Sequence, residues 1–257
     1  MICSVTDPAQ RREFARRIAG KPYFAAVLGT RCALFGPHPA SGWRFYLLPG
    51  EAVLALRGGT ATLCGRLPEG EAGAEAREEL EGFLRFLAVE RLVAEAPPDL
   101  PGWAADSPLL LRELPRGRTL PLPPAPPPEL RLDLHPPMQP VSRLVFPQDR
   151  AEQEQFYSQA CTALAHGFGV CRTLWAGERP VCTVGCYEQS GGEAYLSAGV
   201  TAPDWRGRGL ASWLIVGLAD GLAAARTVRF ACAPALGPFY DRLGFAEAGA
   251  LLQFTRK

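Results

Sequence analysis

Apolar positions alternate between strand spacing and helical spacing along the first half of the chain. Apolar runs bounded by turn residues predict strands at 23–28, 32–35, 43–48, 52–56, 61–64 and 93–96. Helical spacing predicts helices at 8–19 and 74 to about 93. Asp7 and Pro8 suit the start of the first helix, and Gly20 suits its end. We therefore expect an α/β unit in which an antiparallel meander packs against helices.

The second half repeats this order of elements in outline. Its pattern predicts a helix at 149–165, strands at 169–175, 181–187 and 194–200, a helix from 210, a strand at 227–233, a short helix around Tyr240 and a last strand at 250–254. The fold class that follows is α/β, with α+β mixed sheets in two tandem domains. In this interpretation the first half is a degenerate copy of the second. An unrelated α+β domain is the alternative.

A proline-rich segment separates the two halves. Residues 121–128 read Pro-Leu-Pro-Pro-Ala-Pro-Pro-Pro, a composition typical of polyproline II and of stiff spacers. Leu130, Leu132 and Leu134 alternate with charged residues and predict an edge strand. The expected organisation is a domain at 1–114, a linker at 115–139 and a second domain at 140–257.

Composition narrows the class of protein. Lys and Arg number 27 and Asp and Glu 26, a formal net charge of +1, so no charge excess favours nucleic acid or a membrane as a partner. The eight cysteines are scattered without paired metal-ligand spacing, so we expect buried thiols and no metal. The first residues lack the basic and apolar regions of a signal peptide, and no apolar run is long enough to span a membrane. We expect a cytoplasmic protein.

The junction between strand 194–200 and the helix from 210 carries the candidate chemistry. It reads Arg206-Gly207-Arg208-Gly209. The first N–H groups of a helix have no partner within the helix and are open to an anion. Two residues without a Cβ atom and two guanidinium groups at that point predict a site for a pyrophosphate.

Two motifs in this half resemble signatures of one family. Arg206, Gly209 and Ala211 form Arg-x-x-Gly-x-Ala, which resembles the acyl-coenzyme A (acyl-CoA) motif of the GCN5-related N-acetyltransferase (GNAT) family. Residues 239–245, Phe-Tyr-Asp-Arg-Leu-Gly-Phe, look like the family's aromatic-Tyr-x-x-Leu-Gly-Phe signature. The resemblance covers about residues 140–257 and implies the acyl-CoA N-acyltransferase fold.

The resemblance also implies a reaction. An amine attacks the thioester of acetyl-CoA, or of another acyl-CoA, directly in a ternary complex and without an acyl-enzyme. Binding of this co-substrate falls to Gly199, Val200, Thr201, Arg206, Gly207, Arg208, Gly209, Leu210 and Ala211. Tyr240 matches the family's general-acid tyrosine, and a phenol has an ordinary pKa of about 10, close to that of a departing thiolate. The acceptor is an amine of a small molecule or a peptide.

The general base is harder to place. Many relatives carry a carboxylate on the strand before the motif, and the nearest one here is Glu193, at the very start of that strand. Glu193 is the candidate base, with water or an amine that arrives neutral as the alternatives. Asp204 is expected to cap the motif helix or its loop. Relatives often have Asn where this chain has Ala233, which weakens the case for substrate orientation there.

These assignments predict an acyl-CoA-dependent N-acyltransferase, and an N-acetyltransferase in the simplest case. A non-catalytic acyl-CoA-binding or regulatory protein is the alternative, because the motif strand lacks a carboxylate beyond its start. The corresponding junction in the first half carries Glu69, Glu71 and Glu75 and no Arg-x-x-Gly-x-Ala pattern. Carboxylates repel a pyrophosphate, so we expect one acyl-CoA site per chain.

Overall fold

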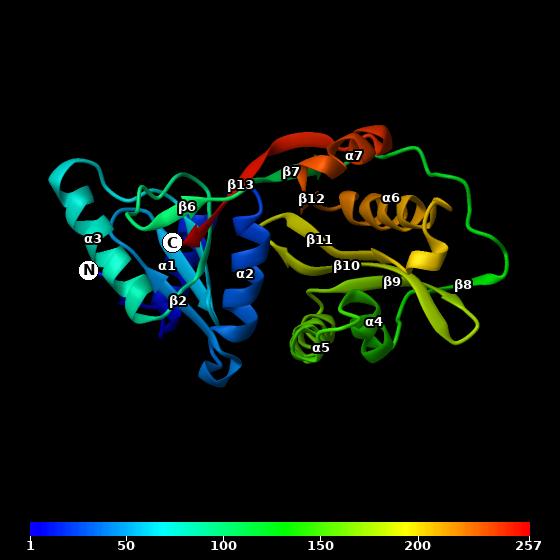
Figure 1. Ribbon diagram of the computed structural model, residues 1–257, viewed down its shortest axis with the longest axis horizontal. Helices are drawn as coiled ribbons and strands as arrows, with labels where there is room; N and C mark the ends of the chain where they lie inside the picture. Colours follow the sequence, from blue (N-terminus) through cyan, green and yellow to red (C-terminus); the bar gives the residue numbers. More distant parts are fainter. The chain divides into compact units, whose positions relative to one another are not determined.

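The computed structural model describes residues 1–257, apart from the side chain of Pro39, and it divides into two compact units. Unit 1 comprises Met1–Leu111, Ala231–Gly237 and Glu247–Lys257, and unit 2 comprises Arg112–Phe230 and Pro238–Ala246. Figure 1 shows the elements of each unit. The division differs from the expected boundaries of 1–114, 115–139 and 140–257, because the C-terminal strand pairs within unit 1 and the proline-rich segment belongs to unit 2.

Unit 1 is a mixed sheet with helices on both faces (Figure 1). Its strands are β1 (Cys3–Ser4), β2 (Trp43–Leu47), β3 (Val53–Arg57), β4 (Thr60–Cys64), β5 (Arg91–Ala94), β6 (Trp103–Ala105) and most of β13 (Ala246–Arg256), and its helices are α1 (Pro8–Ile18), α2 (Phe24–Phe35) and α3 (Gly70–Phe86). The strands lie in the order β1-β2-β3-β4-β5-β13, with β6 also paired to β13. Phe45 of β2 contacts Phe14 of α1, and the next residue, Tyr46, contacts Phe83 of α3. Because successive strand residues face opposite ways, α1 and α3 cover opposite faces.

Helix α1 begins where the sequence predicts. Asp7 Oδ1 accepts hydrogen bonds from the N–H groups of Ala9 and Gln10 at 2.7 and 2.9 Å. The Gln10 side chain in turn accepts from the N–H of Asp7 at 3.1 Å, which completes a capping box.

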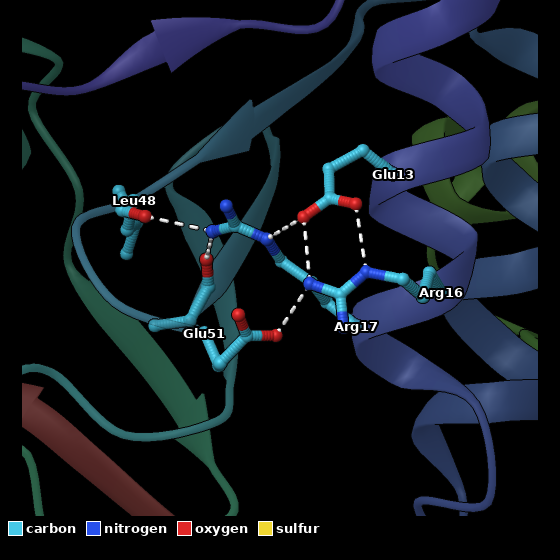
Figure 2. Close-up of polar contacts among 6 residues, drawn as sticks. Glu13, Arg16, Arg17, Leu48 and Glu51 are labelled. Carbon is cyan, nitrogen blue, oxygen red and sulfur yellow. Dashed lines mark hydrogen bonds and ion pairs between the residues drawn. The ribbon is translucent and has the colours of Figure 1, made fainter.

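An ion cluster holds α1 to the turn between β2 and β3 (Figure 2). Glu13 pairs with Arg16 at 2.8 Å and with Arg17 at 2.7 Å. Arg16 also pairs with Glu51 at 2.7 Å, and Arg17 donates to the carbonyl oxygen of Leu48 at 2.8 Å. Hydrogen bonds from Arg16 and then from Arg17 lower the pKa of Glu13 to about 2, so the cluster stays ionised around neutral pH.

The two strands predicted at 23–28 and 32–35 and the predicted end of the second helix are wrong. The runs at 23–28 and 32–35 form the single helix α2, not two strands. Eight of its twelve residues are buried, so apolar residues occur on all sides and the helical period disappears from the sequence. The helix predicted at 74 to about 93 is α3, which ends at Phe86, and β5 begins at Arg91. Helical propensity in the sequence continues beyond the point where the helix ends.

Unit 2 is a second mixed sheet with helices on both faces. Its strands are part of β7 (Leu109–Leu114), β8 (Leu130–Asp133), β9 (Val170–Ala176), β10 (Arg179–Ser190), β11 (Glu193–Thr201) and β12 (Thr227–Cys232), and its helices are α4 (Met138–Val145), α5 (Arg150–Ala165), α6 (Leu210–Ala223) and α7 (Gly237–Leu243). The order is β7-β12-β11-β10-β9-β8, and β11 and β12 are parallel. Helix α6 covers one face, and α4 and α5 cover the other (Figure 1). The predicted helix at 149–165 is confirmed, with Asp149 as its cap.

Helix α4 was not predicted from the sequence. It lies among Pro136, Pro137 and Pro140, which indicate a break in any regular element. Pro137 instead stands at the N-cap and Pro140 lies in the first turn, where a helix tolerates the missing N–H.

The proline-rich segment is held against α6 and is not a free spacer. Gly117 donates its N–H to the carbonyl of Ala223 at 2.7 Å, and Leu120 donates its N–H to Asp220 Oδ1 at 2.9 Å. The Leu120 side chain is buried in the core of unit 2. The predicted edge strand after the segment is confirmed as β8, which pairs antiparallel with β9.

Candidate active site

Strand β11 separates from its neighbour β12 along most of its length. The two pair only from Glu193 to Tyr195, opposite Thr227 to Arg229, whereas β11 continues to Thr201. The separation leaves the C-terminal part of β11 with an open backbone edge. Unpaired backbone N–H and C=O groups at such an edge are available to a ligand.

A β-bulge lies in this open part of β11. Thr183 of β10 pairs with Val200, and Gly185 pairs with Ser197. Two residues of β11, Ala198 and Gly199, therefore face one residue of β10, and Ala198 has a φ of 53°. A bulge leaves the extra residue outside the ladder and turns its backbone groups away from the partner strand.

The loop between β11 and α6 requires glycine at two positions. Gly207 and Gly209 have φ values of 76° and 74°, in the left-handed region that only glycine adopts at little cost. No atom lies within 4 Å of a Cβ added at either position, so the requirement is conformational and not one of space. Gly209 stands at the N-cap of α6, where no side chain caps the first N–H groups.

Two arginines lie beside these N–H groups. Arg206 Nε donates to the Thr201 carbonyl at 3.2 Å, and Arg208 donates to the Asp204 carbonyl at 3.3 Å. The Arg208 guanidinium also stacks over the ring of Trp205, 4.5 Å from its centroid. Neither arginine has an ion pair among the residues that the structure describes, and the positive end of the α6 dipole lies at the same loop.

Asp204 does not cap the loop or the helix. Its carboxylate instead forms a two-fold ion pair with Arg179, at 2.8 and 2.9 Å. The hydrogen bonds from Arg179 lower the pKa of Asp204. The capping prediction was wrong because the N-cap position falls to Gly209, further along the chain, while Arg179 approaches from the β9–β10 hairpin.

One hollow of about 470 Å³ collects all the predicted co-substrate residues. It is lined by Gly199, Val200, Thr201, Trp205, Arg206, Gly207, Arg208, Gly209, Leu210, Ala211, Ser212 and Phe239. Sequence reasoning assigned neither Trp205 nor Phe239 to this site. The position of Phe239 directly before Tyr240 was the signal that could have found it.

Tyr240 directly follows Phe239, which lines the hollow. The Tyr240 ring itself packs in an aromatic cluster. Its ring centroid is 4.4 Å from that of Phe230 on β12 and 4.9 Å from that of Phe239. Phe245 meets Phe230 edge to face at 4.9 Å and completes the cluster. Tyr240 is half-buried, and the assignment of its hydroxyl as a proton donor stays a prediction.

The structure does not bring Glu193 to the hollow. Glu193 begins β11, whereas Thr201 at the other end lines the hollow, roughly 25 Å away along an extended strand. The buried Glu193 side chain is ion-paired with Arg229, which also pairs with Glu113 at 3.0 Å. The position of Glu193 at the far end of β11 from the hollow speaks against it as the base.

Buried hydroxyl and thiol groups lie on the opposite face of the sheet from α6. Thr173 and Thr183 hydrogen-bond at 3.0 Å, and Cys171 Sγ lies 3.6 Å from Thr183 Oγ1. The Tyr187 ring lies over Gly185, where an added Cβ would come within 2.4 Å of it. Burial first, then Cys171, raises the pKa of Tyr187 well above its usual value. Tyr187 therefore stays protonated and cannot act as a base near neutral pH.

Other classes of site find no support among the described side chains. No group of three or more His, Cys, Asp or Glu residues there could hold a metal ion. Every cysteine is a free thiol, with Cys3 exposed, Cys161 half-buried and the rest buried. Within the same described residues, no helix has the length and apolar character needed to cross a membrane.

Comparison with known proteins identifies the fold. No family model and no curated protein matches the chain. Among solved structures, a tandem GNAT protein from the clavulanic acid biosynthesis pathway superposes with a TM-score of 0.69 at 17% identity, over 99% of this chain and 97% of that one. The chain has the acyl-CoA N-acyltransferase fold.

Further neighbours have the same fold. GCN5-related N-acetyltransferases from Kribbella flavida and Sphaerobacter thermophilus give TM-scores of 0.63 and 0.65 at 13% and 14% identity. They cover 90% and 99% of this chain, over 96% and 94% of their own lengths. The near-complete match to a tandem GNAT protein supports an arrangement of this fold in two domains. At these identities the likeness concerns the fold, and chemistry must be argued from the site.

Proposed function

We propose that the chain is an acyl-CoA-dependent N-acyltransferase, and in the simplest case an N-acetyltransferase that uses acetyl-CoA and an amine. The observation that carries the proposal is the hollow at the end of β11. The bulge, the two left-handed glycines, the two arginines and the N-terminus of α6 all border it. Each of these features suits part of a phosphate-bearing thioester.

The chemistry of the hollow fits coenzyme A. Its pyrophosphate carries negative charge, and the N–H groups of Leu210 and Ala211 with the side chains of Arg206 and Arg208 would hold it. The open edge of β11 around Gly199 offers backbone groups to the amide-bearing pantetheine arm. Phe239 adds an apolar wall that excludes water from one side of the hollow.

The chain's own residues would then bind, orient and move protons. Acetyl-CoA supplies an acyl group activated as a thioester. A backbone N–H at the bulge, near Gly199 and Val200, would donate to the carbonyl oxygen as negative charge develops there. Tyr240 would hold the proton that the departing sulfur requires. No carboxylate follows Glu193 on β11, so water would remove the amine proton, or the amine would arrive neutral.

The alternative proposal is a non-catalytic acyl-CoA-binding or regulatory protein. The observation that favours it is the ion pair of Glu193 with Arg229, which leaves β11 without a carboxylate free to act as a base. Both proposals require acyl-CoA binding. They differ only in turnover.

Calorimetry with acetyl-CoA, followed by an amine screen for release of free thiol, separates the proposals. We expect binding and turnover on at least one class of amine. Replacement of Arg206 and Arg208 together by Gln should weaken binding about a hundredfold, since each charge-assisted hydrogen bond contributes about 1.5 kcal/mol or more. Tight binding without turnover on any amine would favour the regulatory alternative, and absence of binding would exclude both.

A further inference from the structure

Strand β7 places a buried cation against the short helix α7. The Arg112 side chain is 5% exposed, and its Nη1 donates to Asp241 Oδ1 at 2.7 Å. Asp241 is 56% exposed and directly follows Tyr240 in α7. The sequence gives no hint of this pair, because 129 residues separate its members.

Helix α7 depends on such contacts for its position. It has seven residues, and a helix of this length is not stable on its own, because nucleation is unfavourable. Its Tyr240 ring packs against Phe230 and Phe245, but apolar packing is not directional. A charge-assisted hydrogen bond has a defined direction, so the Arg112–Asp241 pair can set the rotation of the helix.

A second contact holds the end of α7. The segment that follows β7 brings Leu120 to Gly244, where an added Cβ would lie 3.0 Å from Leu120 Cδ2. Gly244 has a φ of 90° and donates its N–H to the Asp241 carbonyl at 3.0 Å. Leu120 also donates its backbone N–H to the Asp220 side chain of α6 in a hydrogen bond. The segment from Arg112 to Leu120 therefore contacts both helices that border the hollow.

We propose that Arg112 is a positioning residue for the acyl transfer, which fixes α7 through Asp241 so that Phe239 lines the hollow and Tyr240 stays beside it. This inference rests on the proposed function. It also means that the functional unit begins at Arg112 and includes the proline-rich segment, although the two GNAT-like motifs lie within 140–257.

Hydrogen exchange of the intact protein tests the structural part of this proposal without any substrate. Asp241→Asn removes the charge at an exposed side chain, so the fold should survive. The N–H groups of residues 241–245 should then exchange about tenfold faster, because local opening of α7 becomes easier. Arg242→Gln is the matched control: Arg242 lies next on the helix, is exposed, and has no ion pair among the described residues. Unchanged exchange in Asp241→Asn, or equal acceleration in Arg242→Gln, would overturn the proposal.

Kinetics test the functional part. Arg112→Gln should lower kcat about tenfold or more, with Arg112→Lys intermediate, because a lysine keeps the charge but not the geometry of the guanidinium. The KM for acetyl-CoA should rise less than kcat falls, since the arginines and N–H groups of the motif loop stay in place. Full kcat in Arg112→Gln contradicts a positioning role. If the wild-type chain turns over no amine, the proposed function fails, while hydrogen exchange still decides whether Arg112 fixes α7.

Discussion

The hydroxyl of Tyr240 can be removed without disturbing its ring. The ring contacts Phe230, Phe239 and Phe245, and Phe keeps the same aromatic shape. We expect Tyr240→Phe to lower kcat about a hundredfold, the scale of general acid catalysis, with acetyl-CoA affinity within about twofold of wild type. Phe239→Leu is the contrast, because Phe239 lines the hollow and its change should weaken binding first. Full turnover in Tyr240→Phe would remove Tyr240 from the mechanism.

A substitution at Glu193 tests whether this carboxylate is structural or acts as the general base. Its ion pair with Arg229 is buried, but Arg229 keeps its second pair with Glu113, so Glu193→Gln should lower the free energy of unfolding by roughly 2 kcal/mol, the scale of one lost hydrogen bond to a charged group. Activity below the unfolding transition should remain. Without an enzyme base, kcat/KM should rise tenfold per pH unit up to the pKa of the acceptor amine, in wild type and variant alike. Loss of a pH-dependent limb in the variant would restore Glu193 as the base.

The sequence could predict only those site features that depend on residues close together in the chain. Arg206-Gly207-Arg208-Gly209 are adjacent in the chain at the predicted start of a helix, so the sequence indicates an anion site there. The partner of Glu193 is 36 residues away, and no pattern near Glu193 distinguishes a structural carboxylate from a catalytic one. Phe239 was missed for a related reason: an aromatic residue on a core-facing helix and one on a ligand wall look the same in sequence.

The loop between β11 and α6 depends on the left-handed conformation of Gly209, which one substitution can test. Gly209→Ala places a Cβ at a φ of 74°, in open space, so strain of about 1–2 kcal/mol is its main effect. We expect acetyl-CoA affinity to fall about five- to thirtyfold as the loop relaxes into another conformation. Gly177→Ala is the control, since this glycine has a φ of 59° in the β9–β10 turn and also lies in open space. Equal loss of affinity in both variants would point to general destabilisation.

Elements were predictable where a period or a cap marks them. The capping box at Asp7 and the hairpin of β9 and β10 follow from such local signals. Helix α2 did not, because burial on all sides removes the period. The separation of β11 from β12, which opens the hollow, depends on pairing between distant segments and leaves no trace in either strand's pattern.

In unit 1 the parallel strands β4 and β5 pair along the whole of β5, whereas in unit 2 β11 separates from β12. Strands β4 and β5 pair as far as Leu63 and Ala94, and the next residue, Glu95, accepts the Gly65 N–H at 2.8 Å. Lys21 pairs with the same carboxylate at 2.8 Å. Burial alone would raise the pKa of Glu95, but the Lys21 and Gly65 hydrogen bonds together lower it.

The contacts of the Glu95 carboxylate with Lys21 and Gly65 make the stability of unit 1 depend on pH. A carboxyl whose pKa is lower in the folded state contributes stability above its ordinary value of 4.5, and this contribution is lost as pH falls further. Glu95→Gln should therefore lower the melting temperature at pH 7, and the difference from wild type should shrink below pH 4.5. Calorimetric melts at both pH values measure it. A difference in melting temperature that is the same at both pH values would mean that the charge of Glu95 does not stabilise unit 1.

The contrast between the units also predicts the stoichiometry of binding. The hollow of about 370 Å³ beside α3 is lined by Arg66 and Arg77 but also by Glu69 and Asp99, and the adjoining strands β4 and β5 remain paired. Their carboxylates oppose a pyrophosphate, whereas the hollow at α6 is lined by arginines without a carboxylate. We expect calorimetry to give one acetyl-CoA per chain, and Arg206→Gln with Arg208→Gln to weaken that single event. Two events in the wild type, or one that survives the double change at full affinity, would place a site in unit 1 and contradict the view that its closed strands and acidic junction exclude the co-substrate.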